Sequence, residues 1–271
     1  MIMVGKIIAA LIWAFWMMAM STAEGQPLAD NETEYNPTYS STFDRVKKRG
    51  HVICGTNDEF PGFSQERWHL EDGHRWEGFD VDICRAVAAA MFGDADAIEF
   101  TVVNGRTRFE FLIDGSIDVL SATTTFTYTR NVAKKLEFMP TTYYDGQGFI
   151  VRKTLGVSSA KQMEGARICF SGTGTAAKNI ADFMELHEIN YIPVAVPPNE
   201  KTKNVYKRGE CDMYGTDRSG LASNRLSFED PGRHMILPEI ISKEPLGPVV
   251  RYGDQKLSDV VRWTVYVLFI A

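Results

Sequence analysis

The stretch Ser121–Arg130, SATTTFTYTR, holds five threonines, one serine and a closing arginine. It follows GSIDVL (Gly115–Leu120), which is typical of a glycine-terminated helix leading into a short buried strand. Hydroxyl groups can donate hydrogen bonds, and a guanidinium presents a planar fork of donors, so the combination suits an anion such as a carboxylate. Taken alone, Arg130 has an alternative interpretation as a solvated arginine at the start of a helix.

A second polar turn, SGTGT (Ser171–Thr175), is predicted between a strand and a helix. Free N–H groups at a helix N-terminus favour an anion, and Thr173 and Thr175 add hydroxyls. An ordinary helix-capping turn is the alternative. The spacing is not that of a phosphate-binding loop, and no Lys-Ser/Thr pair follows the turn.

The composition indicates a globular protein of one large or two modest domains. The 271 residues are 44% hydrophobic and 24% charged, which are ordinary globular values. The formal net charge of -6 argues against nucleic acid and anionic membranes as partners.

The N-terminus has the features of a secretory signal peptide, predicted to cover residues 1–23. One lysine precedes fourteen apolar residues (Ile7–Met20), and small residues around Ala23 supply a cleavage point. The apolar run is short for a membrane span, although an uncleaved anchor is the alternative. Residues 24–42 are polar and are predicted to form a flexible lead-in.

Export changes the interpretation of the cysteines Cys54, Cys84, Cys169 and Cys211. None of them forms a C-x-x-C pair, and no histidine has a zinc-site spacing, so we expect no metal. In an oxidising compartment, an even count favours two disulfides among three possible connectivities. Four buried free thiols are the alternative.

The chain repeats one layout of alternating strands and helices. In each half, a cysteine-bearing strand is followed by a helix, a strand, a helix and a Gly-x-x-Asp strand; Gly115 and Asp118 correspond to Gly209 and Asp212. In the first half, the two helices are predicted over residues 80–93 and 107–115, and the last strand over residues 116–123. This alternation predicts two α/β lobes with mostly parallel sheets. Because each lobe then owns two cysteines, the preferred disulfides are Cys54–Cys84 and Cys169–Cys211.

Two β-rich segments are predicted to join the lobes. They are TTYYDGQGFIVRK (Thr141–Lys153) and ILPEIISKEPLGPVVR (Ile236–Arg251). Crossing at both gives lobe 1 from residues 43–146 and 244–271, and lobe 2 from 147–243. Two parallel crossings form a hinge, with a ligand cleft between the lobes. The chain ends inside a predicted helix, SDVVRWTVYVLFIA, without a stop signal, so we expect the C-terminal part of lobe 1 to be incomplete.

The strings GFDVDICRAVAAAMFGD, YYDGQGFIVRK, GECDMYGTDRSGLASNR and ILPEIISKEPLGPVVR resemble the periplasmic general L-amino-acid-binding proteins of ABC importers, from about Phe43 to Ala271. The resemblance implies the type II periplasmic-binding-protein fold, with two lobes and two hinge strands. It implies a periplasmic protein that binds free L-amino acids with broad specificity and delivers them to an inner-membrane ABC permease. We expect a monomer without a cofactor.

The resemblance assigns a role to each site residue. Arg130 matches the arginine that binds the ligand carboxylate, and Thr123 and Thr125 match the small polar residues that assist it. Asp217 matches the acid that pairs with the α-ammonium, although its alternative role is to cap a helix. Phe60 matches a position that covers the ligand, with Phe63 as its rival.

In lobe 2, the resemblance places Gly172, Thr173 and Thr175 at the ligand. Relatives usually carry glutamine or a similar residue at Ser171 and a denser threonine run, so the contacts of this turn are open.

Two alternatives to amino-acid transport share this fold. A cyclohexadienyl or arogenate dehydratase would need a general acid, yet Ala176 and Ala177 follow the glycine turn where a catalytic glutamate would sit. A ligand-sensing ectodomain is the other alternative.

Overall fold

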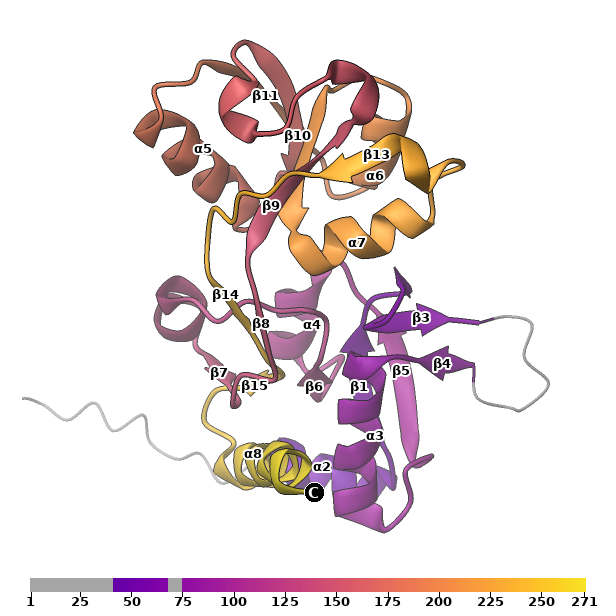
Figure 1. Ribbon diagram of the computed structural model, residues 1–271. Helices are drawn as coiled ribbons and strands as arrows, with labels where there is room; N and C mark the ends of the chain where they lie inside the picture. The colour runs from indigo at the N-terminus through magenta and orange to yellow at the C-terminus, as the bar shows by residue number, and fades with distance from the viewer. Residues whose placement is uncertain (1–40, 68–74) are drawn as a thin grey trace, which may run out of the picture. The chain divides into compact units, whose positions relative to one another are not determined.

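The computed structural model describes residues 41–67 and 75–271, and in this part of the chain the strands form two five-stranded sheets, one three-stranded sheet and one two-stranded sheet (Figure 1). We call the five-stranded sheet that contains residues 52–56, with its helices and the three-stranded sheet packed beside it, lobe 1, and the other five-stranded sheet with its helices lobe 2. The predicted signal peptide and most of the predicted lead-in lie outside the described residues. Ser41 and Thr42, at the end of that lead-in, are the N-cap and first residue of α2.

Lobe 1 contains most of the first half of the chain together with its last segment. Its elements are α2 (Thr42–Arg49), β1 (Val52–Thr56), β2 (Glu59–Phe60), β3 (Ser64–Glu66), β4 (Trp76–Glu77), α3 (Phe79–Phe92), β5 (Ile98–Val102), α4 (Thr107–Asp114), β6 (Val119–Leu120), the π-helical turn η1 (Thr129–Ala133), β7 (Leu136–Phe138), β15 (Val249–Arg251) and α8 (Gln255–Ile270). The predicted helix at residues 80–93 is confirmed. It buries Ile83, Val87 and Met91 and stops at Gly93, whose φ is 72°.

Lobe 2 is built from the middle of the chain. Its elements are β9 (Gln147–Arg152), the 3₁₀ turns η2 (Lys153–Leu155) and η3 (Ala160–Gln162), β10 (Ala166–Ser171), α5 (Ala176–Leu186), β11 (Tyr191–Val196), α6 (Thr202–Lys207), β12 (Met213–Asp217), α7 (Arg218–Leu226), the 3₁₀ turn η4 (Pro231–Arg233) and β13 (His234–Ile236).

The two sheets have the same pattern of strand directions, which confirms the repeated layout. In lobe 1, β1 is parallel to both β5 and β6, and β15 runs antiparallel to β6 and β7. In lobe 2, β10 is parallel to both β11 and β12, and β9 runs antiparallel to β12 and β13. Each sheet is therefore mixed, with its parallel strands at one side.

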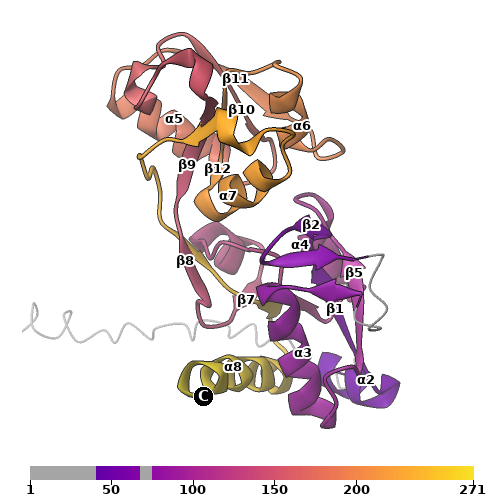
Figure 2. The same ribbon diagram turned by 45° about the vertical axis from the view of Figure 1, so that its right-hand side comes forward.

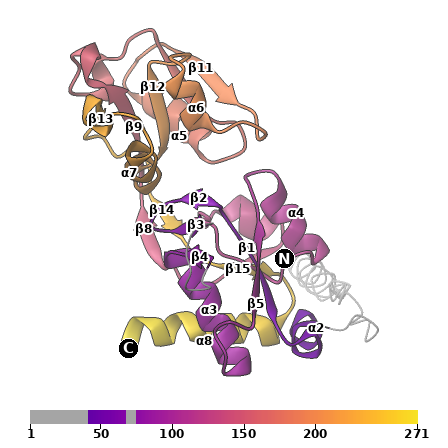
Figure 3. The same cartoon turned by 90° about the vertical axis from the view of Figure 1, so that its right-hand side faces the viewer.

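Helices cover both faces of each sheet. In lobe 1, α2, α3 and α8 form one apolar layer with the sheet, and α4 forms the other. Figure 3 shows α8 beside α3 in this layer. In lobe 2, α5 lies on one face and α6 and α7 on the other (Figure 2). No helix in the described part of the chain has the length and apolar character needed to cross a membrane.

The cysteines pair as the repeated layout predicts. Cys54 of β1 is bonded to Cys84 of α3, and Cys169 of β10 is bonded to Cys211, just before β12. Each disulfide therefore fastens the second strand of one five-stranded sheet, β1 or β10, to a neighbouring element of the same lobe.

The two chain crossings pair with each other in a short ribbon. Strand β8 (Tyr143–Asp145) leads into β9 of lobe 2, and β14 (Glu244–Leu246) returns to β15 of lobe 1. They are antiparallel, with Glu244 opposite Asp145. The exact lobe boundaries at residues 146–147 and 243–244 stay predictions.

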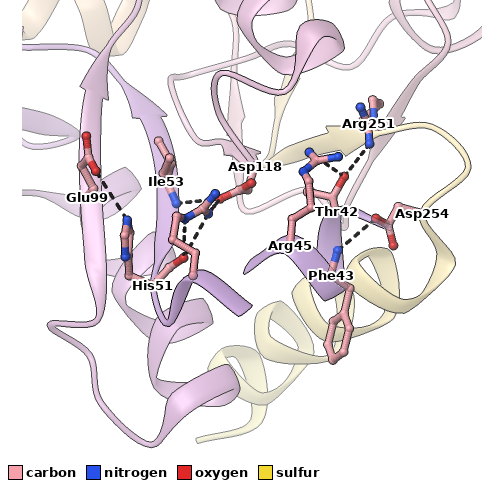
Figure 4. A network of polar contacts seen from close by, with 10 residues as sticks. Thr42, Phe43, Arg45, His51, Ile53, Glu99, Asp118, Arg251 and Asp254 are labelled. Carbon is pink, nitrogen blue, oxygen red and sulfur yellow. Dashed lines mark hydrogen bonds and ion pairs between the residues drawn. The ribbon is translucent and has the colours of Figure 1, made fainter. Parts of the chain in front are cut away.

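The Gly-x-x-Asp motif has the same backbone role in both lobes. Asp118 donates its amide to the carbonyl of Ile53 (2.8 Å) and accepts the amide of Ile53 on its side chain (2.8 Å; Figure 4). Asp212 makes the equivalent pair of bonds with Arg167, both at 2.9 Å. The aspartate thus locks the start of the central strand of its sheet, β6 or β12, to the adjacent strand, β1 or β10.

Candidate ligand-binding site

A pocket of about 530 Å³ is lined by residues from both lobes. Seven of the eight predicted binding residues line it: Phe60, Thr123, Thr125 and Arg130 from lobe 1, and Thr173, Thr175 and Asp217 from lobe 2. The eighth, Gly172, is not among the lining residues described, and its amide donates to the carbonyl of Val196 (2.9 Å). Residues as far apart in the sequence as Phe60 and Asp217 thus line the same pocket.

Arg130 is buried, so its interpretation as a solvated surface arginine is wrong. It lies in η1 and is 7% exposed. Its Nη1 donates to the carbonyl of Thr125 (2.7 Å), and its guanidinium lies 5.2 Å from the centre of the Phe109 ring. Burial lowers the pKa of Arg130. The carbonyl of Thr125 and the ring of Phe109 occupy only part of the guanidinium. Its remaining N–H donors are available to an anion in the pocket.

The threonine turn is held by a buried carboxylate. Asp80, in the first turn of α3, accepts from Ser121 Oγ (2.8 Å) and from the backbone amide of Thr123 (2.9 Å). Burial raises the pKa of Asp80 to about 6, against the opposing effect of these hydrogen bonds. Thr123 has a φ of 43°, which is an unfavourable conformation for a β-branched residue. The turn begins immediately after Leu120, so β6 is shorter than the strand predicted over residues 116–123.

Asp217 ends β12 and stands at the N-cap position of α7, yet no cap hydrogen bond from its side chain is found in the described structure. Instead, Oδ1 accepts from Gln147 Nε2 (3.0 Å). Burial raises the pKa of Asp217 to about 7, and the charges of Glu244 and Asp145 act in the same direction. This geometry favours a cation partner over the capping alternative.

The threonines of the second turn face lobe 1 and the crossing strands. A Cβ added at Gly105 of lobe 1 would collide with Thr173 Oγ1, so the two lobes approach closely at this point. Thr175 precedes α5, but its hydroxyl accepts from Gln147 Nε2 (2.8 Å) and donates to Glu244 (3.3 Å). The capping alternative is therefore wrong for the Thr175 side chain.

Phe60 is the aromatic residue at the pocket wall. It also contacts α7, because a Cβ at Gly220 would lie 3.3 Å from its ring. Phe63, its rival, is not among the described lining residues; it makes edge contacts with Phe60, Phe79 and Tyr143 in an aromatic cluster.

Arg108 lines the pocket beside Arg130, although the sequence pattern places it only on a predicted helix over residues 107–115. Its Nε is buried without a hydrogen-bond partner among the described residues. Burial and the nearby charge of Arg130 lower its pKa to about 9, and Asp217 opposes this effect. Two adjacent guanidinium groups with unused donors are suited to a ligand that carries more than one anionic or carbonyl oxygen.

Gln147 is the second residue missed, although it lies in the string YDGQGF. It is 2% exposed and bridges Thr175 and Asp217. The sequence feature that points to Gln147 is a polar residue inside an otherwise β-rich crossing segment. The sequence pattern alone predicts only that this segment crosses between the lobes.

Ion pairs connect the two lobes at the edge of the pocket, and we call these the mouth pairs. Glu59 of lobe 1 contacts Lys201 Nζ (2.8 Å) and Lys203 Nζ (3.0 Å) of lobe 2. Asp58 lies 3.8 Å from Lys201 Nζ. Hydrogen bonds from the two lysines lower the pKa of Glu59 to about 2.

This architecture is that of a binding protein for small solutes: two crossing strands join two α/β lobes, and the pocket between the lobes has opposite charges on its two sides. The chain belongs to the bacterial extracellular solute-binding proteins, family 3, whose family model matches residues 52–267.

Named relatives agree with this assignment. The chain is 46% identical over 232 residues to the general L-amino acid-binding periplasmic protein AapJ of Rhizobium johnstonii, covering 86% of this chain and 67% of that one. It is 45% identical to the glutamate/glutamine/aspartate/asparagine-binding protein BztA of Rhodobacter capsulatus, covering 86% and 68%.

Solved structures support the fold. An ABC transporter periplasmic binding protein from Brucella ovis with glutathione bound has a TM-score of 0.78 and 43% identity, covering 83% of this chain and 70% of that one. An ancestral arginine-binding protein bound to arginine has a TM-score of 0.66 at 22% identity, covering 82% and 93%, and is evidence for the fold alone.

Proposed function

We propose that this protein is a periplasmic solute-binding protein that captures free L-amino acids of several side-chain classes and delivers them to an ABC transporter permease. The observation that carries the proposal is that Arg130 of lobe 1 and Asp217 of lobe 2 face one pocket. An α-amino acid has one carboxylate and one ammonium, so it neutralises both buried groups at once. The names of AapJ and BztA support the ligand class.

In this proposal, recognition of the α-groups is shared between the lobes. Arg130, with the hydroxyls of Thr123 and Thr125, binds the carboxylate. Asp217 binds the ammonium, and Phe60 covers the ligand. Because the ligand contacts both lobes, it stabilises the arrangement in which they meet, and that arrangement is the one presented to the permease.

Arg108 is the basis for a predicted preference among ligand side chains. Its buried Nε lacks a partner among the described residues, so a carboxylate or amide side chain would gain hydrogen bonds there. We therefore expect glutamate, aspartate and their amides to bind more tightly than alanine or leucine. Glutathione, which has a free α-amino-acid end and a further carboxylate, belongs in the same test because of the Brucella ovis structure.

The remaining parts of the proposal concern the whole chain. Residues 1–23 direct export and are removed, and lobe 1 comprises residues 43–146 and 244–271, with 147–243 as lobe 2. The mature protein acts as a monomer. Size-exclusion chromatography with light scattering tests the monomer, and mass spectrometry of the exported chain tests cleavage after Ala23.

Thermal-shift and calorimetric titration with the twenty L-amino acids, their D-isomers and glutathione test the ligand class. Many L-amino acids should raise the melting temperature, and Arg130→Ala and Asp217→Asn should abolish the shifts. Arg233→Ala and Asp230→Asn are matched controls, since both residues are exposed and absent from the described pocket lining. A cooperative melt that no amino acid shifts would contradict the proposal.

A dehydratase activity has one observation in its favour. Asp217, with its pKa raised to about 7, could hold a proton at neutral pH as a general acid does. Incubation with prephenate and arogenate, followed by detection of their aromatic products, separates the two functions. Turnover that Asp217→Asn abolishes would establish the enzyme.

A further inference from the structure

A network of polar side chains lies behind the pocket, where the two crossing strands meet lobe 2. At its centre is Glu244, the first residue of β14, which is 2% exposed. Its Oε1 accepts from Asn179 Nδ2 (2.8 Å) and Ser242 Oγ (2.7 Å), and its Oε2 accepts from Thr175 Oγ1 (3.3 Å). A buried carboxylate with three donors is a built site rather than a surface contact.

The charge of Glu244 fixes the direction of every bond in this network. A carboxylate has no proton to donate, so the hydroxyl hydrogen of Thr175 points to Glu244. Thr175 Oγ1 must then accept from Gln147 Nε2 (2.8 Å). The amide oxygen of Gln147 accepts from Asn179 Nδ2 (2.9 Å), which fixes the same orientation from the other end.

The consequence reaches Asp217. With its orientation fixed, Gln147 uses the second hydrogen of Nε2 for Asp217 Oδ1 (3.0 Å). One oxygen of Asp217 is thereby held by the protein, and the other is available to a ligand cation. Asp217 lies on β12, Gln147 on β9 and Glu244 on β14, so the network joins the ammonium site to both crossing segments.

We propose that Glu244 is a positioning residue of the ligand-binding site, whose negative charge both orients the Gln147–Asp217 pair and strengthens the attraction for the ligand's ammonium. This inference rests on the proposed function. It accounts for the acid in the string ISKEPLGP, which is otherwise unused by the direct ligand contacts.

Charge makes this role measurable. The groups that act on Asp217 are Glu244 from β14, Asp145 from β8 and Arg108 from α4, with Arg130 of η1 facing the same pocket. Glu244 favours the protonated form of Asp217 in the empty pocket, and it favours the ammonium once the ligand is bound. Removal of its charge should therefore weaken binding and let Asp217 ionise at lower pH.

The experiment measures the affinity for L-glutamine by calorimetry from about pH 5.5 to about pH 7.5, where the α-ammonium and α-carboxylate of the ligand both stay predominantly charged. In Glu244→Gln, we expect binding to weaken by about tenfold at the upper end, and the pH at which affinity begins to fall to move down by about one unit. Glu137→Gln is the matched control. Glu137 is a partly buried carboxylate of lobe 1, ion-paired with Arg262 and absent from the described pocket lining, and its variant should leave the profile unchanged.

Weaker binding with an unchanged pH profile would overturn the electrostatic role, and an unchanged affinity would overturn the whole inference. If Glu244→Gln does not fold, Asn179→Ala tests the same network while keeping the charge, since Asn179 donates to both Gln147 and Glu244 and is absent from the described lining of the 530 Å³ pocket. We expect several-fold weaker binding with the wild-type pH profile, and wild-type affinity would overturn the inference. Failure of the wild-type protein to bind L-glutamine would instead contradict the proposed function.

Discussion

Lobe 1 and lobe 2 share one strand pattern but bring opposite charges to the pocket. Lobe 1 presents Arg130 and Arg108, and lobe 2 presents Asp217. Burial acts on both sides in the same physical way, because it penalises whichever form is charged. It lowers the pKa of the two arginines and raises that of the aspartate.

The outcome nevertheless differs between the lobes. The pKa of Asp217 reaches about 7, whereas that of Arg108 falls only to about 9. The lobe 1 side therefore stays charged at neutral pH, and the lobe 2 side is balanced between two states. The duplicated scaffold thus has one half that stays charged at neutral pH and one half that titrates near it.

The largest expected effect comes from removing either charge. We expect Arg130→Ala and Asp217→Ala each to weaken binding of L-glutamine by at least about a hundredfold, because the opposite charge is left buried and unpaired. Calorimetric titration measures the loss. The double variant should lose less than the sum of the two single losses, because each single variant already leaves one of the two ligand charges unpaired in the pocket. Additive losses would show that the two half-sites act independently.

The Gly-x-x-Asp motif offers a second contrast between the lobes. The Asp118 side chain is fully buried and paired with Arg49, whereas Asp212 is 32% exposed and paired with Arg167. We expect Asp118→Ala to lower the free energy of unfolding by about 2–3 kcal/mol and Asp212→Ala by about 1 kcal/mol, since a deeper donor is left unsatisfied in lobe 1. Urea denaturation of both variants measures the difference.

The two aspartates should also respond oppositely to acid. Burial raises the pKa of Asp118, and the hydrogen bond from Arg167 lowers that of Asp212. An acid with a raised pKa contributes most when protonated, so the loss in Asp118→Ala should grow as the pH falls toward its unfolded value of 3.8. The loss in Asp212→Ala should shrink below 3.8. Parallel trends in the two variants would contradict the contrast.

Ligand affinity should depend on pH through lobe 2 alone. Between about pH 8 and about pH 6, protonation of Asp217 removes the partner of the ligand ammonium. We therefore expect the affinity of the wild-type protein to fall as the pH drops, approaching a tenfold loss per pH unit below the Asp217 pKa. The same titration on Asp217→Asn should give weak binding with a flat profile. A slope that persists in Asp217→Asn would assign the titrating group elsewhere, with Asp80 as the next candidate, since its pKa is raised to about 6.

The smallest expected effect concerns the mouth pairs. Lys203→Gln should weaken binding about threefold at low salt and have a smaller effect at high salt, because the Glu59 end of the pair is open to solvent and its attraction is screened. Lys256→Gln is the control, as Lys256 lies 3.9 Å from Asp44 within lobe 1. Comparable salt dependence in both variants would mean that the mouth pairs do not contribute to closing the lobes on the ligand.

Sequence patterns predicted the elements well where one face of an element is apolar. The helix ending at Gly93, the paired cysteines and the repeated Gly-x-x-Asp strands follow from spacing within one lobe, and the structure confirms each of them. The strand predicted over residues 116–123 is too long, because β6 ends at Leu120. The turn that follows is held by hydrogen bonds to Asp80, which lies forty residues earlier in the sequence.

The candidate site was predictable only for residues within a recognisable motif. Arg130 and Asp217 were found in this way. Arg108 resembles any arginine on an amphipathic helix, and its importance comes from burial beside Arg130. Gln147 and Glu244 are separated by 97 positions and meet through Thr175 and Asn179. Such contacts depend on how the crossing strands return, which local spacing does not encode.

The strand order of lobe 1 also has a consequence for biosynthesis. Strand β15 lies between β6 and β7, so this sheet has a gap until residue 251 has been made. Lobe 2 has all five of its strands once residue 236 has been made. Because the chain is made from its N-terminus, lobe 2 can complete its sheet before lobe 1 does. Until β15 is made, β6 and β7 of lobe 1 each have an unpaired strand edge, and unpaired edges are sites of aggregation.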